Sequence, residues 1–71
     1  MRDEILQKKV GSRIREIRLN KNISQQDLAA KCNFEKSNLS RMEAGRVNST
    51  LATLNVVANA LEINIVELFK F

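Results

Sequence analysis

Apolar residues recur every three or four positions along this chain, which is the spacing of one face of an α-helix. Leu6, Val10, Ile14 and Ile17 set the pattern near the N-terminus. The chain has no proline and only two glycines, and no apolar–polar alternation between turn signals indicates a strand. With 71 residues there is room for one domain only. The sequence therefore predicts a single all-α domain over residues 1–71.

Capping residues divide the first half of the chain into helices. The first helix ends near residues 20–22, and its inner face is the one just described. Ser24 opens the second helix, with Asp27 three residues later in a capping-box pattern. Asn33 follows that helix and tolerates the left-handed conformation that a sharp exit needs. Only three residues, 33–35, then separate the second helix from the third.

Three further helices are predicted in the rest of the chain, giving five in total. The third spans residues 36–44, where Leu39 and Met42 face inward and Gly45 stops the helix. Thr50 caps the fourth, and Asn64 opens a short fifth helix through residue 69. The apolar residues of the fourth helix are Leu51, Leu54, Val57, Ala58 and Leu61.

Composition argues against an enzyme. The chain has no histidine and a single cysteine, Cys32, which removes His-based acid–base catalysis, most metal chemistry and any internal disulfide. Cys32 itself is expected to be a small buried residue in a reducing compartment. No segment approaches a membrane span, and no secretory signal is evident. We therefore expect a cytoplasmic protein with no metal, cofactor or small-molecule effector.

Positive charge is concentrated in the first two thirds of the chain. Residues 1–46 hold eleven basic and six acidic residues, whereas residues 47–71 hold one and two. A basic segment favours a polyanionic partner, although many small proteins share such a balance. The short link between the second and third helices fits the steep crossing of a helix-turn-helix rather than an antiparallel hairpin.

The segment SQQDLAAKCNFEKSNLSRMEAGR, residues 24–46, resembles the helix-turn-helix of the lambda-repressor/Cro-like regulators, also called the XRE family. The resemblance covers about residues 10–69 and implies a compact five-helix DNA-binding domain. Asn33 stands where the family usually has glycine, Ser49 where proline is frequent, and Glu35 where serine or threonine is commoner. The resemblance rests on the joint spacing of Gln25, Ala29, Leu39, Glu43, Gly45, Ala58 and Leu61.

The exposed face of the third helix is the candidate reading surface for double-stranded DNA. Lysine and arginine donate to guanine O6 and N7, and asparagine can pair with adenine. The alternative is that this face is an ordinary solvated polar surface. The candidate base-reading residues are Lys36, Ser37, Asn38, Ser40 and Arg41.

A second group of residues is expected to position the protein on DNA. Ser24 and Gln25 lie at a helix N-terminus, where free N–H groups favour a phosphate, and the resemblance also gives Gln25 a bracing role. Arg46 and Arg15 are further candidate phosphate contacts. The resemblance implies that Arg18 and Glu43 form a structural ion pair between the first and third helices.

The C-terminal segment is expected to form a homodimer interface. A single reading helix contacts few bases, so binding to a pseudo-palindromic operator needs two copies. Phe69 could instead fold back onto the first helix. The function predicted is a transcriptional regulator, either a Cro-like repressor or a restriction–modification controller; the alternatives are an antitoxin and a helical adaptor. The candidate interface residues are Ile65, Val66, Phe69 and Phe71.

Overall fold

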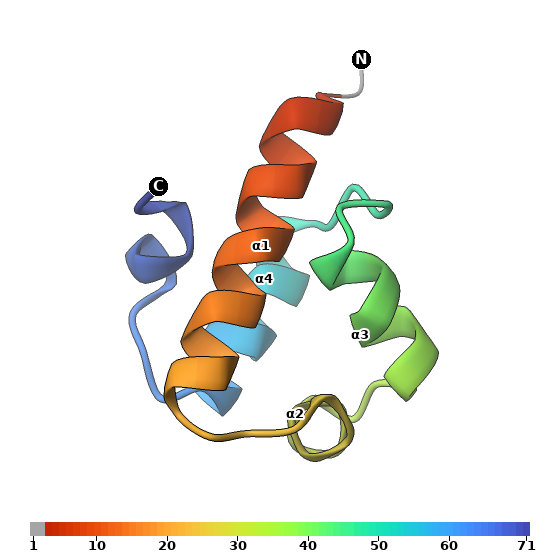
Figure 1. The fold of residues 1–71 in the computed structure, drawn as a ribbon, viewed down its shortest axis with the longest axis vertical. Coiled ribbons are helices and arrows are strands. Elements are labelled where there is room, and N and C mark those ends of the chain that lie inside the picture. The colour runs from red at the N-terminus through yellow and green to blue at the C-terminus, as the bar shows by residue number, and fades with distance from the viewer. Residues whose placement is uncertain (1–2) are drawn as a thin grey trace.

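The computed structural model describes residues 3–71 and is all-helical, as the sequence predicted. Its elements are α1 (Glu4–Asn20), α2 (Gln25–Cys32), α3 (Lys36–Glu43), α4 (Leu51–Ala60) and the 3₁₀-helix η1 (Ile65–Phe69). The fifth element is thus a single 3₁₀ segment rather than an α-helix, in keeping with its five residues. The long α1 runs across the front of the molecule with α4 behind it, α3 on one side and η1 on the other (Figure 1).

Side-chain caps start four of the five elements. Ser24, Thr50 and Asn64 each accept a backbone N–H from two or three residues further on, which confirms the three caps predicted from sequence. Asp3 caps α1 in the same way through the N–H of Leu6. Only α3 begins without such a bond, because its N-cap residue is Glu35. Asn33 adopts the left-handed conformation expected of it, with φ of 59°.

The hydrophobic core lies where all five elements converge. Its centre is formed by side chains with almost no exposure, including Ile14 of α1. Cys32 is buried as expected, and burial raises the pKa of its thiol. The other buried apolar residues are Val10, Ile17, Leu28, Ala29, Leu39, Met42, Leu54, Val57, Ala58, Leu61 and Leu68.

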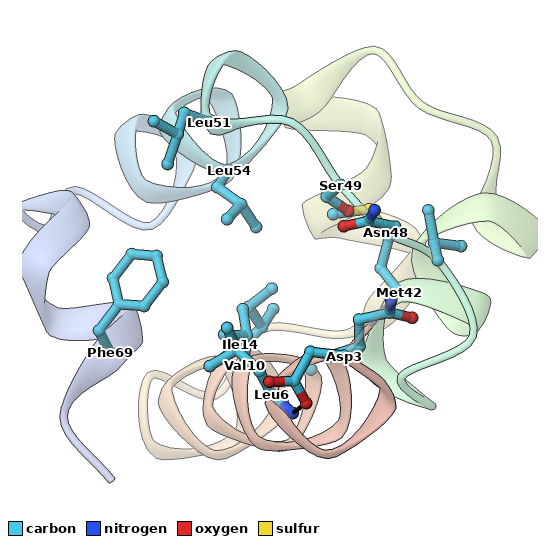
Figure 2. Close-up of a pocket in the computed structure, with 13 residues that line it drawn as sticks. Asp3, Leu6, Val10, Ile14, Met42, Asn48, Ser49, Leu51, Leu54 and Phe69 are labelled. Atoms are coloured by element: carbon cyan, nitrogen blue, oxygen red, sulfur yellow. Dashed lines mark hydrogen bonds between the residues drawn. The ribbon is translucent and has the colours of Figure 1, made fainter. Parts of the chain in front are cut away.

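Two residues expected on inner helix faces are exposed instead. Leu6 is 43 % exposed and Leu51 is 71 % exposed. Leu6 belongs to the first turns of α1, which extend beyond the other helices (Figure 1), and Leu51 is the first residue of α4. With Phe69 they surround a groove of about 310 Å³ whose floor includes Val10 and Leu54 (Figure 2). The periodicity identified the correct face of each helix, but the core does not reach these helix ends.

The C-terminal segment is attached to α1 through Arg13. Arg13 Nε donates to the backbone carbonyl of Glu67 at 2.8 Å, and its Nη1 lies 2.6 Å from the carboxylate of Glu16. A hydrogen bond from Lys70 holds the pKa of the Glu67 carboxyl below its usual value. Arg13 therefore fixes η1 against α1. Among residues 3–71, no helix is both long and apolar enough to cross a lipid bilayer.

Candidate nucleic-acid interface

Helices α2 and α3 form a steeply crossed pair joined by a tight turn. Figure 1 shows α2 almost down its axis while α3 runs across the view. The N–H of Phe34 donates to the carbonyl of Ala29 at 2.8 Å, which closes the turn around the left-handed Asn33. The ring of Phe34 packs against the core, and Ala29 is buried between the helices. A small residue at that position lets the two helices approach closely.

Helix α3 presents one face to the core and the other to solvent. Leu39 and Met42 are buried, as their three-residue spacing predicted. The five candidate reading residues are all exposed on this one short helix: Lys36, Ser37, Asn38, Ser40 and Arg41. Two of them are in contact, because Arg41 Nη2 donates a hydrogen bond to Asn38 Oδ1. The sequence analysis did not anticipate this pairing.

A buried ion pair holds α3 from behind. Arg18 of α1 donates through Nε to Glu43 Oε2 at 2.8 Å and through Nη2 to Oε1 at 3.0 Å. The two side chains are only 7 % and 3 % exposed. Arg18 Nη1 also donates to the carbonyl of Ile23, between α1 and α2, at 2.8 Å. Two parallel N–H···O bonds from a planar guanidinium fix orientation as well as distance. The structure thus brings together the pair that the resemblance implied.

The predicted positioning residues are divided between two environments. The hydroxyl of Ser24 accepts the N–H of Asp27 at 3.0 Å, so it caps α2. Gln25 Nε2 donates to Glu43 Oε1 at 3.1 Å, which adds a third element to the buried pair. Arg15 and Arg46 are exposed, on α1 and just after α3. Gln25 therefore braces the end of α3, whereas the two arginines face solvent.

Gly11 has a packing role that was not predicted from the sequence. A Cβ atom built on Gly11 would lie 2.3 Å from the backbone oxygen of Met42 and 2.8 Å from that of Glu43. Helices α1 and α3 therefore approach so closely that only glycine fits at this position. The available signal was a glycine inside a helical apolar pattern, which commonly marks a close packing contact.

The C-terminal residues expected at a dimer interface differ in their exposure and packing. Ile65 is partly buried and packs against the core, so it exposes less surface than the other three candidate interface residues. Its side chain turns inward because η1 is fixed against both α1 and α4. Val66, Phe69 and Phe71 are 56 %, 38 % and 58 % exposed. Phe69 lines the groove from the η1 side, with Leu6 and Val10 on the α1 side (Figure 2). Phe71 lies beneath the ammonium of Lys9, 5.5 Å from its ring centre.

A steeply crossed helix pair, buried on one side and presenting a polar helix on the other, defines a helix-turn-helix DNA-binding domain. The helix-turn-helix family pattern matches residues 14–68 of the chain. The chain is 43 % identical over 56 residues to the immunity repressor protein of Bacillus phage phi105, covering 79 % of this chain and 39 % of that protein. It is 34 % identical over 62 residues to control protein C.BamHI of Bacillus amyloliquefaciens, covering 86 % and 76 %.

Solved structures agree with this assignment. The restriction-modification controller protein C.AhdI from Aeromonas hydrophila superposes with a TM-score of 0.84 at 37 % identity, covering 87 % of this chain and 94 % of that one. The chain therefore belongs to the helix-turn-helix family, and the resemblance found in its sequence is confirmed. It carries the helix-turn-helix DNA-binding domain of that family. The chain spans about two fifths of the phage repressor's length, 39 %.

Proposed function

We propose that this protein binds a pseudo-palindromic operator in double-stranded DNA as a homodimer, in the cytoplasm, and thereby regulates transcription from the adjacent promoter. The observation that carries the proposal is the exposed face of α3. Its five polar side chains are exposed to solvent, whereas Leu39 and Met42 on the opposite face of the same helix are buried in the core. In this arrangement α3 enters the major groove, where such side chains can reach base edges.

The chemistry of this face suits base recognition. The guanidinium of Arg41 and the ammonium of Lys36 can donate to guanine O6 and N7, and the serine hydroxyls can donate or accept. Arg46 and Arg15 are exposed and can approach phosphates on either side of the groove. Ser24 lies where the free N–H groups of α2 favour a phosphate oxygen. We assign base reading to the α3 face and backbone contacts to these flanking groups.

The relatives favour two kinds of regulator. One is a phage immunity repressor, and two are controller proteins of restriction–modification systems. Both kinds fit a protein that controls a nearby promoter. The neighbouring gene separates them: a restriction enzyme or methyltransferase gene indicates a controller, and a divergent repressor gene indicates a phage regulator.

Reading residues and phosphate contacts should respond differently to substitution. We expect Arg41→Ala to weaken binding by ~1–3 kcal/mol and to relax the preference at one base pair. Arg46→Ala should weaken all duplexes about equally and reduce the salt slope by roughly one. Binding selections from a randomised duplex library, followed by titrations at two salt concentrations, measure both effects.

Lys31→Ala is the matched control for these charge changes. Lys31 is an exposed base in the last turn of α2, away from the N-terminal turn that we place against phosphate. Its removal should leave base preferences unchanged and alter the salt slope less than the loss of Arg46 does. Wild-type affinity that is equal at both salt concentrations, or the same for every duplex, would contradict the proposed function.

A homodimer needs an apolar surface that one copy leaves open. Val66, Phe69 and Phe71 give the C-terminal segment such a surface, and Leu51 extends it along the groove. Exposed apolar patches commonly mark interfaces, and aromatic residues are enriched at interface centres. A two-fold axis through this end would place two copies of α3 about one DNA turn, ~34 Å, apart.

Val66→Glu should prevent dimer formation without unfolding the protein, because Val66 is mostly exposed in one copy. We expect the dimer dissociation constant to rise about tenfold or more, since a carboxylate would be buried without a partner. Leu19→Glu is the control, because Leu19 is similarly exposed but lies at the C-terminal end of α1, outside the proposed interface. Sedimentation equilibrium compares the variants. A wild type that stays monomeric at micromolar concentrations, or equal effects of both variants, would exclude this interface.

A further inference from the structure

Two of the reading residues on α3 are joined before any DNA is bound. Arg41 Nη2 donates to Oδ1 of Asn38, one helical turn earlier on the same exposed surface. Residues three apart on a helix are neighbours, so the bond requires no distortion of the backbone. Lys36, Ser37 and Ser40 make no comparable side-chain contact among residues 3–71. Arg41 and Asn38 are therefore a distinct pair within the reading face.

The surface around the pair separates it from the rest of that face. Asn38 and Arg41 both line a shallow hollow between α3 and the loop that leads to α4, together with Asn48 and Thr50. None of the other three reading residues borders this hollow. Asn38 thus lies on the flank of α3 next to the loop, with Arg41 between it and the serines.

The bond limits what Asn38 can do alone. A bidentate contact with adenine requires the amide oxygen to accept from N6 while the amide nitrogen donates to N7. Here Oδ1 of Asn38 already accepts from Arg41, so a bidentate adenine contact would have to share that oxygen between two donors. Adenine therefore competes with Arg41 for the Asn38 oxygen.

The same bond helps Arg41. A free arginine side chain has many rotamers, and ordering it before binding leaves less conformational entropy to lose at the DNA. The guanidinium has five N–H donors, so a bond to Asn38 leaves enough for O6 and N7 of one guanine. A neutral amide also adds no negative charge beside the phosphates. Glu43, the acidic residue near this end of α3, is buried against Arg18 instead.

We propose that Asn38 is a positioning residue that orients the Arg41 guanidinium toward guanine, and that it does not read adenine itself. The inference rests on the proposed function, because it assumes that α3 reads bases. Asn38 and Arg41 then act on one base pair. Helix α3 therefore specifies fewer base pairs than its number of exposed polar residues suggests.

The test is a set of base-preference profiles from the same randomised duplex library. Arg41→Ala identifies the base pair that Arg41 specifies by relaxing its guanine preference. Asn38→Ala should relax that same base pair, by about three- to tenfold, and create no change at any other. The double variant should lose no more preference than Arg41→Ala alone, because the pair acts as a unit. Ser37→Ala is the control and should leave this base pair unchanged.

Asn38→Asp distinguishes positioning of Arg41 from a purely structural role of Asn38. Aspartate keeps an acceptor oxygen for Arg41 but adds a negative charge near the phosphates. It should therefore retain the guanine preference while binding every duplex more weakly. Asn38 and Arg41 are exposed, so unfolding temperatures should stay unchanged and exclude loss of fold.

The possible outcomes distinguish failure of the positioning role of Asn38 from failure of the proposed function. If the wild type shows no sequence preference, the proposed function fails. If Arg41→Ala relaxes one base pair and Asn38→Ala relaxes a different one, or none, DNA reading by α3 stands and the positioning role of Asn38 is wrong. Loss of the guanine preference in Asn38→Asp would also overturn that role.

Discussion

Replacing Gly11 by alanine is expected to remove a large part of the protein's stability. The new methyl group would meet backbone oxygens of α3, which cannot move aside as a flexible side chain can. Overpacking of this kind costs ~1–3 kcal/mol and occasionally more, and here we expect about 3 kcal/mol. A chain of this length has a total stability of roughly 4–10 kcal/mol at ~0.05–0.15 kcal/mol per residue. Urea unfolding followed by circular dichroism measures the loss.

The sign of this change is informative, because helix propensity acts in the opposite direction. In an open helix, Gly→Ala stabilises by up to ~1 kcal/mol. Ser12→Ala is the control, since Ser12 is exposed on the same turn of α1 and should gain a few tenths of a kcal/mol. A Gly11→Ala variant with a higher urea midpoint than the wild type would mean that α1 and α3 do not touch here.

Removing the carboxylate of Glu43 should have an effect at least as large. Glu43→Ala leaves the guanidinium of Arg18 buried without its charged partner and also frees the amide of Gln25. Breaking one partner of a buried pair costs ~3–5 kcal/mol. Glu16→Ala is the matched control, because the Glu16 carboxylate also accepts from an arginine but is mostly exposed, and its loss should cost ~0–1 kcal/mol.

A double variant separates the cost of breaking the pair from its net contribution. Arg18→Met with Glu43→Leu removes both charges and keeps most of the volume, so it should recover much of the stability lost in Glu43→Ala. If the single and double variants are equally unstable, packing rather than an unpaired charge explains the loss. If Glu43→Ala unfolds at the same urea concentration as Glu16→Ala, the pair does not stabilise the fold.

The parts of the structure that could be predicted from sequence are governed by local signals. Helix periods, the caps at Ser24 and Thr50, and the left-handed turn at Asn33 depend on residues within a few positions of one another. These signals were enough to locate the helices and the inward face of α3. The ion pair between Arg18 and Glu43 joins residues 25 apart and followed only from the family resemblance.

The features that were not predicted from the sequence depend on packing between helices and on contacts between side chains. Leu6 and Leu51 have the right period for a core residue, but they lie in the first turns of α1 and α4 and border the groove instead of the core. Gly11 is required because the backbone of α3 passes close to it; a glycine within a helical apolar pattern indicates close packing but not which element packs there. The bond between Arg41 and Asn38 depends on rotamers of exposed side chains, for which the sequence carries no signal.

The separation between the two faces of α3 has a consequence for how such a regulator can change its target. Gly11, Arg18 and Glu43 fix the helix from the inner side, and the five exposed polar side chains of α3 take no part in that support. Surface substitutions of this kind typically alter stability by less than ~0.5 kcal/mol. If α3 reads DNA as we propose, a lineage can exchange its exposed residues in successive steps and acquire a new operator, while each intermediate protein still folds.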